Sequence, residues 1–136
     1  LDCQTAITRL TSLGDGSGQL ALERRGVPQG KLPNQDVYSV TLASNMRAVY
    51  VVCDGYGPLG HLVAFRIAQN LPKLVLEAAA SSGSTSPELI LTKAFQDAGV
   101  ELVQFFEMQG VPLEGSGTTA AVALRNGDLV HVAWLG

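Results

Sequence analysis

The sequence predicts an α+β fold in which a pair of helices is inserted between antiparallel strands. Three observations support this prediction: two apolar, β-type runs lie at hairpin distance in the first half, two segments with helical spacing follow, and an Asn126-Gly127 turn signal separates two alternating segments near the end. Strands joined by so few residues pair as antiparallel neighbours. The chain is therefore expected to place its helices against an antiparallel sheet.

Three strands are expected in the first half of the chain. Residues 1–16 are mixed and show only a turn signal, so the first expected strand is 17–25, where polar and apolar residues roughly alternate. Two prolines and two glycines make residues 26–33 a loop. The other two strands are residues 37–43 and 48–53, which are separated by a short polar segment.

The pairing of these last two strands determines where two aspartates lie. If the strands form a hairpin around residues 44–47, the start of one strand lies opposite the end of the other. Asp36 precedes the first strand and Asp54 follows the second. Both carboxylates are therefore expected at the same edge of the sheet.

The apolar spacing becomes helical near Gly60. One face of the predicted helix carries Leu59, Leu62, Val63, Ile67 and Leu71. Pro72 is expected to end this helix or to begin a second short one, because proline inside a helix removes a hydrogen bond and clashes with the preceding turn.

A further helix is expected from the capping signal Ser86-Pro87-Glu88 to a stop at Gly110. Its buried stripe is predicted to contain Ile90, Ala94, Ala98, Leu102 and Phe105. Residues 117–125 and 129–135 then form the strands of the last hairpin.

The composition limits the classes of protein and partner. Charged residues make up only 15% of the 136 residues and hydrophobic residues 46%, so either the core is large or further polypeptide covers part of the surface. The chain begins without methionine and ends in an alternating pattern, and we expect it to be a piece of a larger domain. A net charge of −3 makes nucleic acid an unexpected partner, and no segment resembles a membrane span or a signal peptide. Cys3 and Cys53 are expected to be reduced thiols of an intracellular protein, in the cytoplasm or the nucleus.

The segment VVCDGYGPLGH, residues 51–61, raises the question of function, because a carboxylate follows a buried apolar run and glycines follow the carboxylate. Asp54, the carbonyl of Gly55 and Asp36 from across the hairpin could bind a hard divalent cation such as magnesium or manganese. An equally weighted alternative is purely structural, with Asp54 as a helix N-cap and Asp36 in an Asx-turn.

The same segment also matches the dinucleotide-binding pattern GxGxxG, with Glu77 near the spacing of the ribose-binding acid. That interpretation requires a parallel strand ending at Glu77, whereas hairpin strands precede the motif here. Pro58 also lacks the backbone N–H that a pyrophosphate would need. We therefore disfavour a dinucleotide site.

Four separate segments resemble the metal-dependent serine/threonine protein phosphatases of type 2C: GKLPNQD at 30–36, VVCDGYGPLGH at 51–61, the Ala94-Phe95 helix, and GSGTTAAVALRNGDLVHVAWLG at 115–136. The resemblance covers most of residues 17–136. It implies part of a four-layer αββα sandwich, with antiparallel β-sheets flanked by helix pairs. Residues 1–136 would then be the N-terminal portion of a single, incomplete type 2C domain.

The resemblance also implies roles for individual residues in a two-metal centre holding Mg²⁺ or Mn²⁺. Asp54 matches an aspartate that bridges both metals, Gly55 matches a glycine that offers its carbonyl, and Asp36 matches an aspartate that holds a water on a metal. Lys31 stands where an arginine commonly holds the substrate phosphate. Lysine keeps the charge but loses the bidentate fork, so weaker orientation of the phosphate is expected.

Two positions depart from the family pattern. Gln35 replaces a glutamate that many members associate with metal, and Tyr56 replaces the histidine that protonates the leaving alcohol. A tyrosine has an ordinary pKa near 10 against about 6.5 for histidine, so it is the poorer acid at neutral pH. His61 and His131 are expected to be structural, and Ser116 is expected to mark the entry of a strand and not a serine nucleophile.

The resemblance therefore implies hydrolysis of phosphoserine and phosphothreonine in phosphoprotein substrates. This chain alone is expected to have little or no activity, because the C-terminal half of the domain would supply the remaining metal ligands. The alternative is a catalytically impaired pseudophosphatase that acts as a protein-binding or regulatory domain.

Overall fold

A computed structural model describes residues 5–12, 18–24, 33–44, 46–81 and 86–136, the first two ranges by their backbone alone. Its elements in chain order are β1 (Thr5–Ser12), β2 (Gly18–Arg24), β3 (Asp36–Ala43), β4 (Arg47–Tyr56), α1 (Gly60–Ser81), α2 (Pro87–Met108), β5 (Gly117–Asn126) and β6 (Leu129–Leu135).

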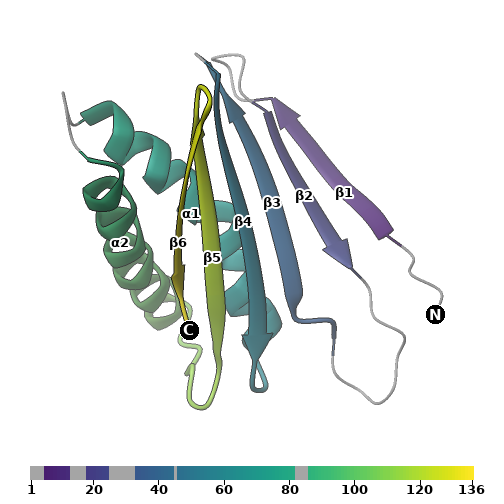
Figure 1. Ribbon diagram of the computed structural model, residues 1–136. Helices are drawn as coiled ribbons and strands as arrows, with labels where there is room; N and C mark the ends of the chain where they lie inside the picture. Colours follow the sequence, from purple (N-terminus) through teal and green to yellow (C-terminus); the bar gives the residue numbers. More distant parts are fainter. Residues whose placement is uncertain (1–4, 13–17, 25–32, 45, 82–85) are drawn as a thin grey trace.

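The strands form one antiparallel sheet in the order β1-β2-β3-β4-β5-β6, and both helices lie on one face of it (Figure 1). The predicted α+β arrangement is confirmed. The described residues supply one sheet and one helix pair of the four-layer sandwich; its second sheet and second helix pair stay predictions. All the described strands pair antiparallel and Glu77 lies within α1, so the parallel strand that the dinucleotide-binding interpretation requires is replaced by a helix.

Three strand predictions need correction. β1 was not expected from residues 1–16, whose sequence is mixed. β4 continues three residues beyond Cys53, because its pairing with β5 extends as far as Tyr56 opposite Gly117, so Asp54 lies inside the strand and not at its end. The last hairpin forms as predicted, but its loop is Gly127-Asp128, since Asn126 pairs with Leu129.

The prediction for Pro72 is wrong, because α1 continues through it to Ser81. Proline at this position cannot donate a hydrogen bond to the carbonyl of Ala68, four residues earlier. The buried hydroxyl of Ser39 on β3 donates to that carbonyl instead, at 2.7 Å. The sheet therefore satisfies the acceptor that the helix leaves open.

The start and end of α2 agree with the sequence prediction. Ser86 accepts a hydrogen bond from the Leu89 N–H at 3.3 Å, Pro87 occupies the first turn, and Gly110 takes a positive φ of 65° just beyond the helix. Of the predicted stripe, Ile90, Ala94 and Ala98 are buried, while Leu102 and Phe105 are half-buried and Phe106 is buried instead.

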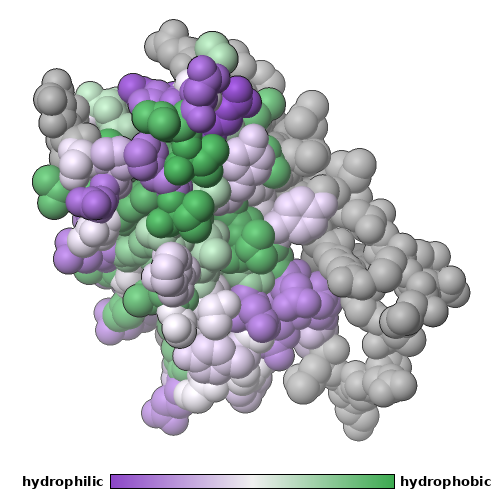
Figure 2. Space-filling view, viewed as in Figure 1, coloured by the Kyte–Doolittle hydropathy of each residue, from purple (hydrophilic) through white to green (hydrophobic). Residues whose placement is uncertain are grey.

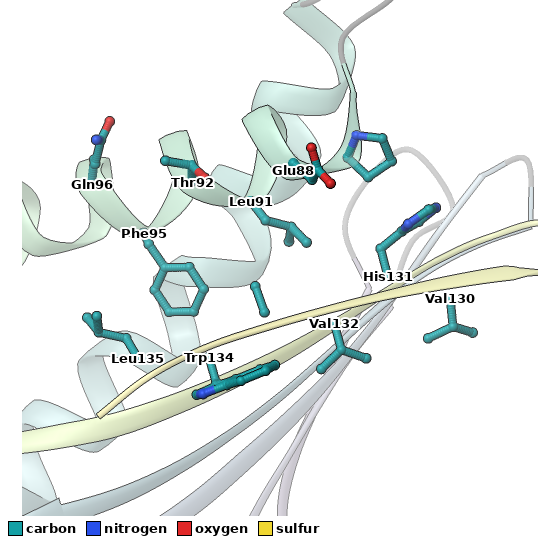
Figure 3. A pocket seen from close by; sticks show the side chains of 12 residues that line it. Glu88, Leu91, Thr92, Phe95, Gln96, Val130, His131, Val132, Trp134 and Leu135 are labelled. Carbon is teal, nitrogen blue, oxygen red and sulfur yellow. The ribbon is translucent and has the colours of Figure 1, made fainter.

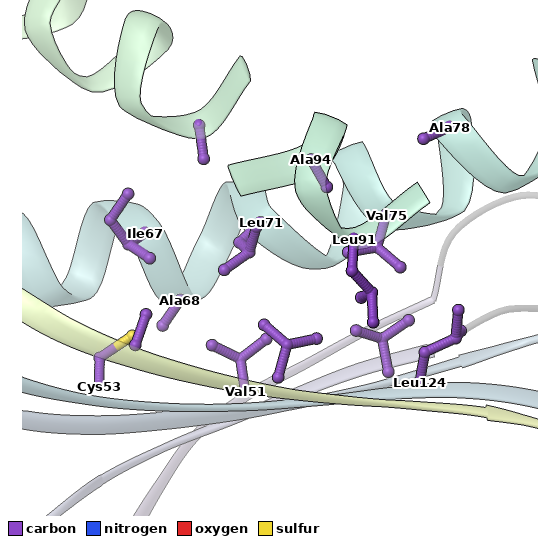
Figure 4. Close-up of a cluster of buried hydrophobic side chains, with 14 of the residues drawn as sticks. Val51, Cys53, Ile67, Ala68, Leu71, Val75, Ala78, Leu91, Ala94 and Leu124 are labelled. Atoms are coloured by element: carbon purple, nitrogen blue, oxygen red, sulfur yellow. The ribbon is translucent and has the colours of Figure 1, made fainter. Parts of the chain in front are cut away.

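The core lies between the helix pair and one face of the sheet (Figure 4). Alternate residues of β4 and β5 face α1 and α2, and Leu71 and Val75 of α1 pack against them. Arg66 also links the helices, since its guanidinium is paired with Glu101 and lies 3.9 Å from the centre of the Phe105 ring.

The other face of the sheet is here called the open face, and neither described helix lies over it (Figure 1). Figure 2 shows that hydrophobic side chains gather there over β4 to β6. The exposed apolar residues on this face are Leu42, Tyr50, Val52, Tyr56, Val130, Val132 and Trp134. Of the two described helices, neither is long and apolar enough to cross a membrane.

Candidate functional site

The start of β3, the end of β4 and the start of β5 meet at one end of the sheet, the lower end in Figure 1. Asp36 and Asp54 are direct partners in the β3–β4 pairing, as predicted. Opposed residues of an antiparallel pair place their side chains on the same face, with Cβ atoms about 4.5–5.5 Å apart. Both aspartates are exposed on the open face, so their carboxylates can reach one cation.

Thr119 is the partner of Asp54 on the other side, in β5. It is exposed, and its hydroxyl donates to the Asp54 carbonyl at 3.5 Å, the outer limit of a hydrogen bond. The sequence analysis did not single out Thr119. Thr119 is identified only by the pairing of β4 with β5. That pairing cannot be predicted from local sequence, because α1 and α2 separate the two strands in the chain.

Gly55 is buried on the helix-covered side of β4, and its N–H donates to the Gln35 carbonyl at 3.0 Å. A Cβ at this position would overlap the carbonyl oxygen of Gly60, the first residue of α1. Glycine is therefore required for the close approach of the helix, in addition to any approach of an ion to its carbonyl.

These residues fit one part of a hard-cation site. Two facing carboxylates and a backbone carbonyl are oxygen ligands, and Mg²⁺ is commonly bound through one or two carboxylates while it keeps several waters. Across the described ranges there is no group of three or more His, Cys, Asp or Glu residues that could hold a metal by itself. Further ligands for a two-metal centre would have to come from elsewhere.

Gln35 precedes Asp36 in the chain, and its side chain reaches the start of α1. Its side-chain oxygen is buried, finds no hydrogen-bond partner among the described residues, and would overlap a Cβ on Gly60. The side chain therefore fills the space between β4 and the start of α1. The sequence analysis noted Gln35 as a departure from the family pattern and gave it no role.

Tyr56 is on the open face and is 58% exposed. A Cβ on Gly117, its partner in β5, would overlap the Tyr56 hydroxyl, so the phenol lies across that glycine. The ring therefore extends toward β5, while Asp36 lies on the opposite, β3 side of Asp54.

The other predicted or considered residues are not part of this cluster as described. Lys31 lies outside the described residues, so its predicted contact with phosphate stays a prediction. His61 is the second residue of α1, with a buried Nδ1 that has no hydrogen-bond partner in the described ranges. His131 lies in β6, away from the aspartates.

Cys53 precedes Asp54 and is a free, buried thiol on the helix-covered side of β4. Burial raises its pKa from 9.0 to about 12, although a hydrogen bond with Thr118 acts in the opposite direction. The thiol is therefore neutral and poorly nucleophilic at physiological pH. It contributes to packing beneath the aspartates.

A hollow of about 740 Å³ lies between α2 and β6, apart from the paired aspartates (Figure 3). Leu91 and Phe95 of α2 face His131 and Leu135 of β6 across it. Its volume is typical of ligand pockets, but only Glu88 and His131 of its lining can ionise. Its lining comes from α2 and β6, whereas the paired aspartates lie on β3 and β4. The volume of a hollow therefore does not locate the candidate cation site.

Comparison with known proteins adds an independent observation. The chain is 34% identical over 86 residues to "Probable protein phosphatase 2C 64" of Oryza sativa subsp. japonica. The matched part of this chain is therefore similar to part of a type 2C protein phosphatase. The match takes in 62% of the chain but only 20% of that relative, so the activity of the complete protein does not follow from it. No family model matches the sequence, and no solved structure matches it.

Proposed function

We propose that the type 2C region supplies one part of a divalent-cation centre that hydrolyses phosphoserine and phosphothreonine in proteins. The observation that supports this most directly is the pairing of Asp36 with Asp54 on one face of the sheet, beside Gly55. The similarity to a probable type 2C phosphatase agrees with it.

In this proposal the residues of the chain bind and orient. Asp54 and Asp36 present carboxylate oxygens, Gly55 presents its carbonyl, and Lys31 attracts the substrate phosphate. Mg²⁺ or Mn²⁺ bound there would neutralise phosphate charge and make a nucleophile of water near neutral pH.

The test is Asp54→Asn in the complete polypeptide that carries this region, with Asp128→Asn as the matched control at the far end of the β5–β6 hairpin. Asp54→Asn should lower Mn²⁺-dependent phosphate release from a phosphoserine peptide by roughly a hundredfold or more, because a charged ligand is lost. Asp128→Asn should leave it within about twofold. Full activity of Asp54→Asn with a working Asp128→Asn control would contradict the proposal.

The isolated 136-residue chain should have little or no activity. Two facing carboxylates do not complete a two-metal centre, and no further metal-binding cluster is found in the described ranges. Phosphate release by the purified chain at the rate of the complete polypeptide would show this to be wrong.

A second candidate function is a phosphatase-like domain with impaired catalysis that binds phosphoproteins or regulates them. The observation in its favour is Tyr56, a tyrosine where the family pattern has a histidine, whose hydroxyl lies over Gly117. Loss of general-acid assistance typically costs a hundredfold or more.

Tyr56→His in the complete polypeptide separates the two candidates. If the missing acid limits catalysis, turnover of a phosphoserine peptide at neutral pH should rise roughly tenfold or more, because the serine alkoxide needs a proton to leave. Turnover of p-nitrophenyl phosphate, whose leaving group needs no proton at that pH, should barely change. An unchanged rate on the peptide would mean that Tyr56 is not the cause of any impairment.

We also propose that the protein acts inside the cell on phosphoproteins. The free, buried Cys53 thiol supports this location. Microscopy of the tagged complete polypeptide is the direct check, and a purely extracellular signal would contradict it.

A further inference from the structure

The segment that leads into β5, Gly115-Ser116-Gly117, packs backbone to backbone against the turn between β4 and α1. Gly57 in that turn has a φ of 80°, and a Cβ there would overlap the carbonyl oxygen of Gly115. No side chain separates the two segments at this point. Glycine at position 57 therefore permits direct backbone contact between the two segments.

Ser116 makes the polar link between these segments. Its Oγ accepts a hydrogen bond from the Leu59 N–H at 2.9 Å, across 57 positions of sequence. Leu59 stands immediately before α1, and its carbonyl already accepts from the N–H groups of Leu62 and Val63, at 2.9 and 3.1 Å. Its own N–H is one of the donors that a helix leaves unsatisfied at its start, so Ser116, the residue just before β5, caps α1 from a distant part of the chain.

The start of α1 is in turn the structure that holds Gly55. The Gly60 carbonyl lies against Gly55 closely enough to exclude a Cβ, and Gly55 adjoins Asp54 in β4. A shift of the first turn of α1 would therefore displace the backbone that presents the Gly55 carbonyl and the Asp54 carboxylate. The Ser116 hydroxyl holds the backbone immediately before that turn through a hydrogen bond from a side chain outside the helix.

We propose that Ser116 is a positioning residue for the divalent-cation site: by capping α1 it keeps Gly55 and Asp54 in the geometry that the cation requires. This inference rests on the proposed function. Residues that orient metal ligands without touching the metal typically change affinity 10- to 100-fold when mutated.

Ser86 provides a matched control. It also caps a helix through its Oγ, accepting from the Leu89 N–H at 3.3 Å, but it does so at the start of α2. α1 begins near the end of β4 that carries Asp54 and runs to the opposite end of the sheet, and α2 runs back in the other direction (Figure 1). Ser86, at the start of α2, therefore lies at the end of the sheet remote from Asp54. Serine-to-alanine substitution removes the same chemical group at both sites.

The experiment measures Mn²⁺ affinity by isothermal titration calorimetry and the melting temperature in the presence of a chelator, in the complete polypeptide. Ser116→Ala and Ser86→Ala should both lower the melting temperature of the metal-free protein, because each loses a helix cap. Only Ser116→Ala should weaken Mn²⁺ binding, by about tenfold or more. Ser116→Thr, which keeps the hydroxyl, should restore affinity to within about threefold of the unsubstituted protein.

Equal Mn²⁺ affinity for Ser116→Ala and Ser86→Ala would reduce Ser116 to a structural cap and overturn the inference. If Ser116→Ala does not fold, Ser116→Cys takes its place with the same expectation, since a thiol of similar size is a weak acceptor. Asp54→Asn separates this outcome from failure of the proposed function. Mn²⁺ binding that Asp54→Asn abolishes and Ser116→Ala leaves intact contradicts the inference alone, whereas absence of Mn²⁺ binding in the unsubstituted protein contradicts both.

Discussion

The two faces of the β-sheet differ in what covers them, although the strands supply apolar residues to both. In β4, Val51 faces the helices and is 1% exposed, whereas its neighbour Val52 faces the other way and is 60% exposed. A strand with one solvated face normally alternates apolar and polar residues, while a nearly continuous apolar run is typical of a strand covered on both faces. The run Ala48–Cys53 is of the second kind. The four-layer sandwich implied by the family resemblance would place its second sheet on the open face.

The largest expected difference between the faces is chemical reactivity. Burial raises the pKa of the Cys53 thiol from 9.0 to about 12, which lowers its thiolate fraction about a thousandfold at pH 8. Cys53 should therefore react slowly in a Cys3→Ser variant, in which it is the remaining native thiol. A thiol introduced by Val52→Cys on the open face should react at an ordinary rate. Labelling with a maleimide, followed by mass spectrometry, measures both rates in one molecule.

Comparable labelling rates at positions 52 and 53 would mean that the helix-covered face is open to solvent. The control is unfolded protein, in which both thiols should react alike.

The next largest difference between the faces is expected in the free energy of unfolding, when a valine on each face is truncated to alanine. Val51→Ala should cost about 2–3 kcal/mol of the free energy of unfolding, since it removes buried methyl groups and leaves a cavity. Val52→Ala should change it by less than about 0.5 kcal/mol in the isolated chain. Urea titration of both variants measures the two values.

Val51→Ala and Val52→Ala also test whether a second sheet covers the open face. If another sheet covers the open face in the complete polypeptide, Val52→Ala should there cost about as much as Val51→Ala. A negligible cost in both contexts would argue against the four-layer prediction.

A smaller effect is expected on the covered face at Ser39. Ser39→Ala leaves the Ala68 carbonyl buried and unsatisfied opposite Pro72, which should cost about 1–2 kcal/mol. In a Pro72→Ala background the helix can supply an N–H to that carbonyl, so the same substitution should cost less. A double-mutant cycle by urea unfolding would refute this explanation of Pro72 if the two effects simply added.

The smallest effect is expected where α1 and α2 meet at their solvent-exposed edge. Partial burial raises the pKa of Glu101, but hydrogen bonds from Arg66 and Asn70 and the charges of Arg66 and Lys73 outweigh it and lower the pKa below its ordinary value of 4.5. A lowered pKa stabilises the fold at pH values above the ordinary one, and this contribution is lost as the pH falls through the folded-state pKa. Because the pair is partly exposed, Glu101→Gln should cost less than about 1 kcal/mol at neutral pH.

Melting temperatures of this variant and the unsubstituted protein should therefore converge on acidification. A gap that persists at about pH 3 would assign the stabilisation to packing and not to charge.

The sequence predicted most of what depends on local pattern. The hairpin of β3 and β4, with Asp36 opposite Asp54, follows from two apolar runs and a short polar connection, and the start of α2 follows from Ser86-Pro87-Glu88. Pro72 was misjudged because the group that compensates for it, the Ser39 hydroxyl, belongs to a strand 33 residues earlier in the chain. The roles of Gln35, Ser116 and Thr119 were missed for the same reason: each depends on a contact between segments that only the folded chain brings together.

Asp36 and Asp54 face each other directly in the β3–β4 pairing, and like charges in that position repel. This repulsion opposes the metal-free strand pairing at the end where the chemistry is proposed to occur. A cation between the carboxylates would replace that repulsion with attraction, so occupancy and folding would be thermodynamically linked. Depletion of divalent cations would then lower the stability of the folded protein itself.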